Sequence, residues 1–164
     1  MVETARLLLM PAPLDLIEAV ATSTRERVAF PAAVPGDWPD EDLRDFLPTY
    51  ARILAEDPEG ACWGVWVIIE KASRTVIGDI GFKGAPDERG RVEIGYSVLP
   101  AWRRQGYAAE AARALVDWAL ADPDVMAVQA ECLAANGPSA RVLEKIGMRC
   151  RGRQADMLLW EIAR

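Results

Sequence analysis

Arginines and small residues follow one another between Arg103 and Ala108 in an order that suits the binding of a phosphate group. An apolar run ends at Leu99, and an Ala-rich sequence typical of a helix begins at Gly106. Small side chains let a ligand approach the backbone closely, and the first turn of a helix offers N–H groups and a partial positive charge. This segment therefore predicts a pyrophosphate site. The alternative is an ordinary helix start with solvated arginines.

Proton transfer in this chain must depend on side chains other than histidine, because the sequence has none. Ser-His and Cys-His triads and histidine-ligated metals are thereby excluded. Glu93 is the best candidate for a general base, since it lies on the alternating run 91–99 that leads into the arginine-containing turn. The alternative is an exposed strand carboxylate that pairs with Arg91 or Lys83.

Two polar residues at a second helix start are candidates for binding or catalysis. Asn136 begins the segment Asn136-Gly137-Pro138-Ser139, which is typical of a helix N-terminus. Each also has an ordinary structural interpretation: Asn136 could cap its helix, and Ser139 could satisfy a backbone N–H.

The thiols give no sign of a metal site. Cys62, Cys132 and Cys150 lie far apart without a CxxC spacing, so neither zinc nor any other metal is expected. An odd number of cysteines indicates reduced thiols. Cys62 and Cys132 lie in strand-like apolar runs and are expected in the core.

The secondary-structure elements that must position these residues are a mixture of strands and helices. Apolar periodicity and turn signals predict seven strands and four helices. The strands are expected at 6–10, 62–69, 75–82, 91–99, 127–133, 148–152 and 157–162, and the helices at 14–21, from Asp40 to about Leu54, 106–120 and 136–146. This order predicts a mixed α/β sheet, an antiparallel meander followed by a parallel strand–helix–strand crossover.

Size and charge restrict the class of protein. The chain has 164 residues, which predicts one domain over 1–164. A net charge of −6 disfavours nucleic acid as a partner and permits a cationic substrate, although it also simply favours solubility. No apolar run is long enough to span a bilayer, and residues 1–6 do not resemble a signal peptide. We therefore expect a cytoplasmic protein without a membrane partner.

The segment 98–108 resembles the acetyl-CoA signature R/Q-x-x-G-x-G/A of the GNAT superfamily of N-acetyltransferases, with Arg103, Gly106 and Ala108 at the defined positions. Segment 136–148 resembles the second family motif, N-x-x-S-x-x-x-x-E-K-x-G-F/M. The start Glu3-Thr4-Ala5-Arg6-Leu7-Leu8-Leu9 is similar to the branch that acetylates ribosomal-protein N-termini and related amines, which usually has Arg where this chain has Met10. Together these similarities cover nearly the whole chain.

The resemblance implies a GNAT-like, mostly antiparallel sheet of about seven strands and acetyl-CoA as co-substrate. It implies a primary amine as acceptor, either a protein N-terminus or a small molecule, that attacks the thioester directly. The N–H groups from 104 to 109 would bind the pyrophosphate, and those of Val98 and Leu99 would pair with the pantetheine arm. The implied cofactor-binding residues are Val98, Leu99, Arg103, Arg104, Gln105, Gly106, Tyr107, Ala108, Asn136 and Ser139.

The implied catalytic residues include one departure from the family. Val98 N–H would be the oxyanion donor, and Glu93 the base, directly or through water. Leu143 occupies the position where many members have a tyrosine acid, and Ser139 is the implied substitute. The region after the first strand often shapes substrate choice in the superfamily. Trp38 and the acids near it could cover the acceptor site, and the alternative is a solvated acidic helix start. One of Trp63 and Trp66, expected on opposite sides of a strand, could line the acceptor groove.

Other functions remain open from the sequence. A catalytically weak acyl-CoA-sensing module would also fit, because the tyrosine is absent. A nucleotide-dependent phosphotransferase is disfavoured, since no glycine-rich loop with a phosphate-binding lysine exists. The sequence leaves a monomer and a homodimer equally open, although closing strands often pair between subunits in the superfamily.

Overall fold

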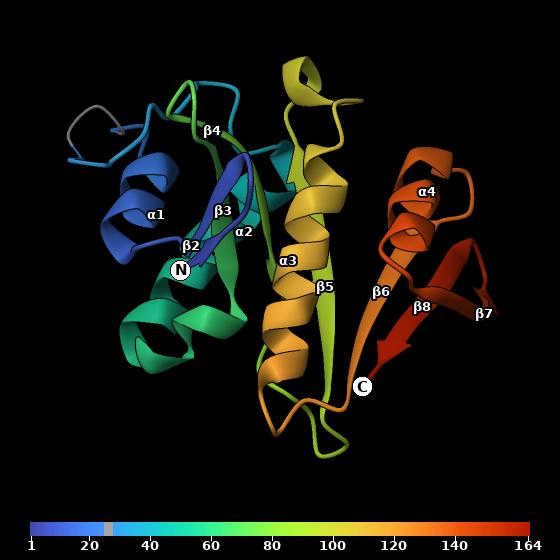
Figure 1. The fold of residues 1–164 in the computed structure, drawn as a ribbon. Helices are drawn as coiled ribbons and strands as arrows, with labels where there is room; N and C mark the ends of the chain where they lie inside the picture. The colour runs from blue at the N-terminus through green and yellow to red at the C-terminus, as the bar shows by residue number, and fades with distance from the viewer. Residues whose placement is uncertain (25–27) are drawn as a thin grey trace.

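The computed structural model describes residues 1–24 and 28–164, which form one mixed sheet with helices on both sides (Figure 1). The strand order is β1-β2-β3-β4-β5-β6-β8-β7. The strands are β1 (Val2–Glu3), β2 (Leu7–Pro11), β3 (Val65–Glu70), β4 (Thr75–Phe82), β5 (Arg91–Val98), β6 (Ala127–Leu133), β7 (Arg149–Gln154) and β8 (Met157–Ala163). The helices are α1 (Leu14–Ala21), α2 (Glu41–Glu56), α3 (Tyr107–Ala121) and α4 (Gly137–Lys145), with short 3-10 turns η2 (Glu59–Trp63) and η3 (Pro100–Trp102).

The pairing of β5 with β6 divides the sheet into two halves. All other neighbouring strands are antiparallel, whereas β5 and β6 are parallel and are joined by α3, as the sequence predicts. Their register runs only from Arg91↔Ala127 to Glu93↔Gln129. Both strands continue beyond that point, β5 to Val98 and β6 to Leu133. The two strands therefore separate toward their carboxyl ends.

Each face of the sheet has its own apolar core. On the face covered by α3 and α4, side chains such as Ile77 and Ile80 of β4 pack against the Ala-rich side of α3. On the opposite face, which we call the α2 face, Val67 and Val76 pack under α1 and α2. Figure 1 shows α3 lying along the middle of the sheet. Successive residues of a strand alternate between these faces, and this determines which β5 side chains reach each side.

The structure corrects the sequence prediction at the start of β3. Cys62 and Trp63 belong to η2 and not to a strand, because the Asp57-Pro58 break and Gly60 favour a tight turn. Trp63 and Trp66 were expected on opposite sides of the sheet, yet both rings contact Trp118, at 5.1 and 5.2 Å between centroids. A two-residue strand, β1, also adds an eighth strand to the seven predicted, because a pair this short leaves no periodic pattern.

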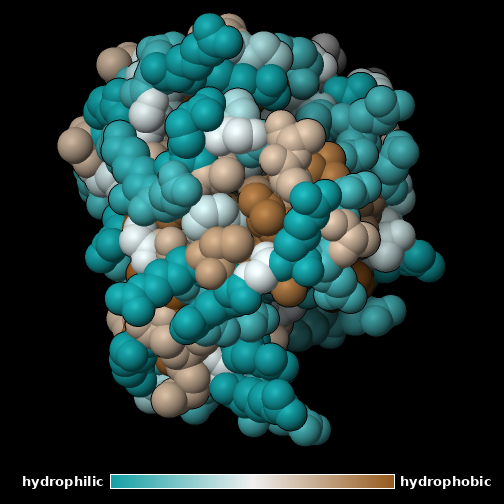
Figure 2. All heavy atoms as spheres, turned by 90° about the vertical axis from the view of Figure 1, so that its right-hand side faces the viewer, coloured by the Kyte–Doolittle hydropathy of each residue, from teal (hydrophilic) through white to brown (hydrophobic). Residues whose placement is uncertain are grey.

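The surface on the side of α4, β8 and β7 is mainly hydrophilic around a central group of apolar residues (Figure 2). Within residues 1–24 and 28–164, no helix combines the length and the apolar character that a membrane span requires.

Candidate active site

The separation of β5 from β6 leaves backbone groups at the end of β5 directed away from β4. Leu99 N–H donates to the Ile77 carbonyl at 2.8 Å, so Val98 and Gly78, which lie opposite each other one position earlier, form a non-hydrogen-bonded pair. The Val98 N–H and C=O consequently point toward β6, beyond the last β5–β6 pairing. We call the space between the separated ends of β5 and β6 the opening. Of the two amides expected to bind pantetheine, the Val98 N–H points into this opening, whereas the Leu99 N–H already donates to the Ile77 carbonyl.

The turn after β5 leads into the N-terminus of α3. Arg104 and Gly106 both have left-handed backbone conformations, with φ of 61° and 84°, and Gly106 is the N-cap of α3. The first N–H groups of α3 have no acceptor inside the helix. Arg103 turns back, and its Nε donates to the Val98 carbonyl at 2.7 Å, which ties the turn to the end of β5.

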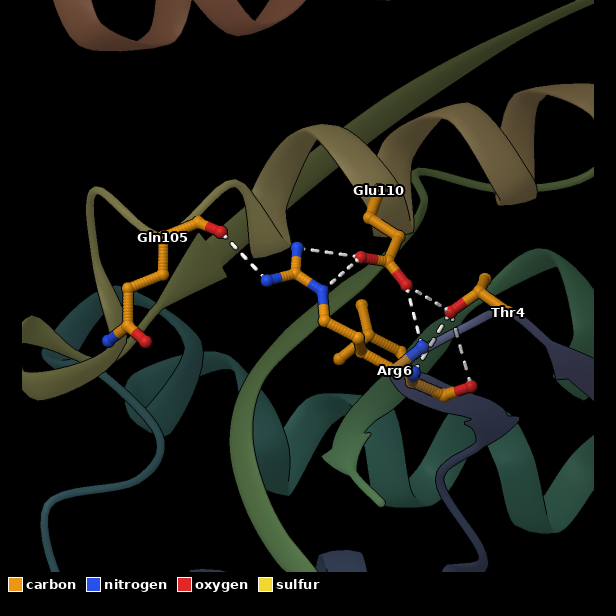
Figure 3. Close-up of polar contacts among 5 residues, drawn as sticks. Thr4, Arg6, Gln105 and Glu110 are labelled. Carbon is orange, nitrogen blue, oxygen red and sulfur yellow. Dashed lines mark hydrogen bonds and ion pairs between the residues drawn. The ribbon is translucent and has the colours of Figure 1, made fainter. Parts of the chain in front are cut away.

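A polar clamp of three residues, Thr4, Arg6 and Glu110, holds this turn from the N-terminal side (Figure 3). Glu110 accepts hydrogen bonds from the Thr4 hydroxyl at 2.6 Å and from Arg6 Nε at 2.7 Å. The Arg6 guanidinium also donates to the Gln105 carbonyl at 3.0 Å and lies 4.3 Å from the centre of the Tyr107 ring.

The clamp gives a physical role to the Glu3–Leu9 motif, because it joins the first residues of the chain to the start of α3. Burial alone would raise the pKa of Glu110, but the hydrogen bonds from Thr4 and Arg6 outweigh it and lower that pKa. Glu110 therefore stays ionised at neutral pH. Its role was not predicted, since only a folded chain brings residues 4 and 110 together.

Tyr96 forms a hydrogen bond with the predicted Ser139 between β5 and α4. The Tyr96 hydroxyl of β5 lies 3.0 Å from Ser139 Oγ at the start of α4. Burial raises the pKa of the Tyr96 phenol, and the Ser139 bond opposes that shift only in part, so the phenol carries its proton at neutral pH. Leu143, at the position where the superfamily often has tyrosine, is buried in the core. The alternation along β5 placed Tyr96 on the same face as Val98, but no sequence pattern linked it to Ser139.

Asn136 caps α4. Its Oδ1 accepts the Ser139 N–H at 3.1 Å, which is the ordinary interpretation that the sequence also allowed. The two candidate residues at this helix start are thereby held together beside Tyr96.

Glu93 lies on the α2 face and forms an ion pair with Lys83, one of the two alternatives that the sequence left open. About 30% of its side chain is exposed. It precedes Val98 by five positions of the strand, roughly 17 Å of extended chain.

A cavity of about 630 Å³ lies between α2, η2, the end of β4 and Gly95 in the middle of β5. Phe46 and Tyr50 of α2, Trp63 and Phe82 contribute to its mostly apolar wall. Asp79 of β4 also lines it and is only 9% exposed. Neither the cavity nor Asp79 was predicted, since an isolated acid in a strand gives no sequence signal of burial.

Trp38 accompanies Asp79 at this cavity. Its indole Nε1 donates to Asp79 Oδ2 at 2.9 Å, and its side chain is completely buried. Trp38 thus lies behind Asp79, and its role at an acceptor site stays a prediction.

Comparison with known proteins identifies one family. The profile described as "Acetyltransferase (GNAT) domain" matches residues 6–149. An N-acetyltransferase of Bacillus subtilis called YjdG, itself uncharacterized, is 31% identical over 161 residues, which is 98% of this chain and 96% of that protein.

Solved structures show the same fold. A GNAT-family acetyltransferase from Bacillus anthracis is 24% identical and superposes with a TM-score of 0.68 over 99% of this chain and 97% of its own. The ribosomal L7/L12 alpha-N-protein acetyltransferase RimL, solved with coenzyme A, is 16% identical with a TM-score of 0.70 over 98% and 95%.

Proposed function

This chain belongs to the acetyltransferase (GNAT) family, and on that premise we propose that it transfers an acetyl group from acetyl-CoA to a primary amine by direct attack. The opening between β5 and β6 carries the proposal. There the Val98 amide, the N-terminus of α3 and the Tyr96–Ser139 pair converge from segments far apart in the sequence.

The residues around the opening fit coenzyme A. The left-handed turn at Arg104 and Gly106 and the first turn of α3 offer N–H groups that suit a pyrophosphate. The Val98 N–H, directed away from β4, suits an amide-bearing arm laid alongside β5, whereas the Val98 carbonyl accepts from Arg103 Nε. Asn136 and Ser139 face that arm from α4 in this proposal.

The same residues would carry the transfer. Bound acetyl-CoA supplies the thioester that the amine attacks. Val98 N–H stabilises the charge that develops on the acetyl oxygen. The Tyr96 phenol, through Ser139 Oγ, holds a proton for the departing sulfur. Glu93 is the sequence-predicted base, acting directly or through water.

Calorimetric titration with acetyl-CoA tests the proposal first, with ATP as the control nucleotide. We expect one saturable site for acetyl-CoA and none for ATP. The loaded protein should then release free thiol when primary amines are added. Binding without thiol release for any amine would support the sensing module, and absence of binding would refute the site.

A further inference from the structure

The cavity on the α2 face reaches β5 at Gly95, three positions before Val98. Asp79 is paired with Ser97 across the β4–β5 ladder, and opposed residues of a hydrogen-bonded pair have Cα atoms about 5.5 Å apart. Ser97 directly precedes Val98. Asp79 therefore lies on the neighbouring strand at the level of Ser97 and Val98, whereas Glu93 lies four positions before Ser97 along β5.

A β-bulge determines which side Asp79 reaches. The register of β3 with β4 shifts between Ile68 and Ile69, so that Ile68 pairs with Gly78 and Ile69 with Val76. After the bulge Ile80 points to the α3 core. Asp79, its neighbour, points to the α2 face, toward Trp38 and the cavity.

The carboxyl at this cavity is poised to receive a cation. Burial raises its pKa to about 7, although the Trp38 indole opposes the shift and the Asp40 charge adds to it. A buried carboxylate without a counter-ion is costly, and an ammonium group provides that counter-ion. The cavity wall also carries aromatic rings, which attract a cation that lies over a ring face.

The wall opposite Asp79 is apolar and uncovered. Phe46 and Ile53 of α2 line the cavity and remain 44% and 49% exposed, which is unusual for large apolar side chains near a cavity unless a ligand covers them. Phe46 stacks on Tyr50 at 5.9 Å between ring centroids. A cavity of about 630 Å³ falls in the range of small-molecule sites.

We propose that Asp79 binds the ammonium group of the acceptor, and that the acceptor is a small primary amine carried on an apolar group of about the size of one aromatic ring. The amine then gives a proton to Asp79: one N–H bond breaks, an O–H bond forms on the carboxylate, and the freed lone pair faces the acetyl group. The inference rests on the proposed function and names its substrate class and base.

The test compares 2-phenylethylamine with its uncharged analogue 2-phenylethanol, each titrated by calorimetry into the protein saturated with coenzyme A. The wild-type protein should bind the amine at least about tenfold more tightly than the alcohol. Asp79→Asn should reduce that preference to near unity while acetyl-CoA affinity stays within about twofold. Asp45→Asn, an exposed acid on α2, controls for the change in net charge.

A second, independent test fills the cavity with a larger side chain. A Cβ built on Gly95 meets no atom within 4 Å, and Gly95 lines the cavity, so the first atom of a side chain is accommodated there and the rest would extend toward the cavity. Gly95→Leu should raise the KM for 2-phenylethylamine at least about tenfold, and Gly95→Ala much less.

Several results would overturn the inference. They are an unchanged charge preference in Asp79→Asn, unchanged KM in Gly95→Leu, a larger loss of kcat in Glu93→Gln than in Asp79→Asn, or turnover of spermidine or a peptide N-terminus in preference to 2-phenylethylamine. Each leaves the proposed function intact as long as acetyl-CoA binds. Failure of acetyl-CoA itself to bind would instead refute the proposed function.

Discussion

Burial of Asp79 makes the stability of the protein depend on pH. Its folded-state pKa of about 7 lies above the ordinary value of 3.8, so between these values the folded chain keeps a proton that the unfolded chain releases. Stability attributable to this group is complete below pH 4 and decreases as pH rises to 7, by about 1.4 kcal/mol for each unit of pKa difference.

Asp79→Asn tests this titration. The amide oxygen can still accept the Trp38 N–H, but it carries no charge. The free energy of unfolding is measured in urea at pH 5 and at pH 8 for both proteins. From pH 5 to pH 8 the wild-type protein should lose about 2–3 kcal/mol more than the variant, as the linkage relation requires. An identical difference at both pH values would mean that the carboxyl titrates normally.

The Tyr96–Ser139 pair makes a prediction about proton donation. Tyr96→Phe removes the hydroxyl 3.0 Å from Ser139 Oγ and should lower kcat by roughly 10- to 100-fold. This loss of rate is at or below the smallest effects usual for a general acid, about 100-fold, because a departing thiolate is only weakly basic and needs little help from a proton donor. Ser139→Ala should cost a similar amount, and the double variant little more, since both act in one relay.

Steady-state kinetics across pH distinguish this relay from a structural bond. If the hydroxyl only supports α4, Tyr96→Phe would lower stability without changing kcat. Unchanged kcat at every pH would remove Tyr96 from the chemistry.

At the scale of elements, the turn between β5 and α3 depends on Gly106. With φ of 84°, any side chain there costs on the order of 1–2 kcal/mol in backbone strain. Gly106→Ala carries this cost alone, whereas Gly106→Glu also places a negative charge at the proposed pyrophosphate site. We expect the Ala variant to weaken acetyl-CoA binding modestly and the Glu variant to abolish it.

Circular dichroism confirms that both Gly106 variants are folded before calorimetry is done. Equal acetyl-CoA affinities for the two folded variants would show that the phosphates do not lie at this turn.

The clamp between the first strands and α3 makes a second prediction at this scale. Glu110→Gln removes the charge that holds Arg6, which should loosen the carbonyl contact to Gln105. Acetyl-CoA affinity should fall by roughly 3- to 10-fold, in line with a partly exposed ion pair with additional hydrogen bonds. Asp117→Asn, which breaks a separate exposed pair with Arg113 on the same helix and leaves the bond from Arg113 to the Ile146 carbonyl in place, should leave affinity unchanged.

Sequence periodicity predicted the elements well where side chains alternate regularly. The bounds of α1, β4 and β6 match the expected 14–21, 75–82 and 127–133, and the parallel crossover is confirmed. It was wrong at Cys62 and Trp63, where a turn interrupts an apolar run. Only part of the site could be predicted from the sequence. The turn 103–108 shows its function in consecutive residues, whereas Tyr96–Ser139, Arg6–Glu110 and Asp79–Trp38 are contacts between segments far apart in the sequence.

At the scale of the whole molecule, the structure consists of two half-sheets, and within residues 1–24 and 28–164 their strands pair with one another only along β5–β6, over three register positions. The core under α3 joins the two halves as well. A ligand bound in the opening contacts both halves and should oppose their separation. Acetyl-CoA at 100 times its Kd should raise the free energy of unfolding by about 2.7 kcal/mol through linkage alone.

Hydrogen exchange shows where that stabilisation acts. In the proposed geometry, acetyl-CoA should slow exchange at Val98, in the first turn of α3 and at the start of α4, and leave β1 and the η2 turn unchanged. Gly106→Glu provides the control, because it should lose all of this protection. Protection confined to α2 and η2 would place the nucleotide on the wrong face of the sheet and would require the cavity beside Asp79 to be reassigned from the amine to the cofactor.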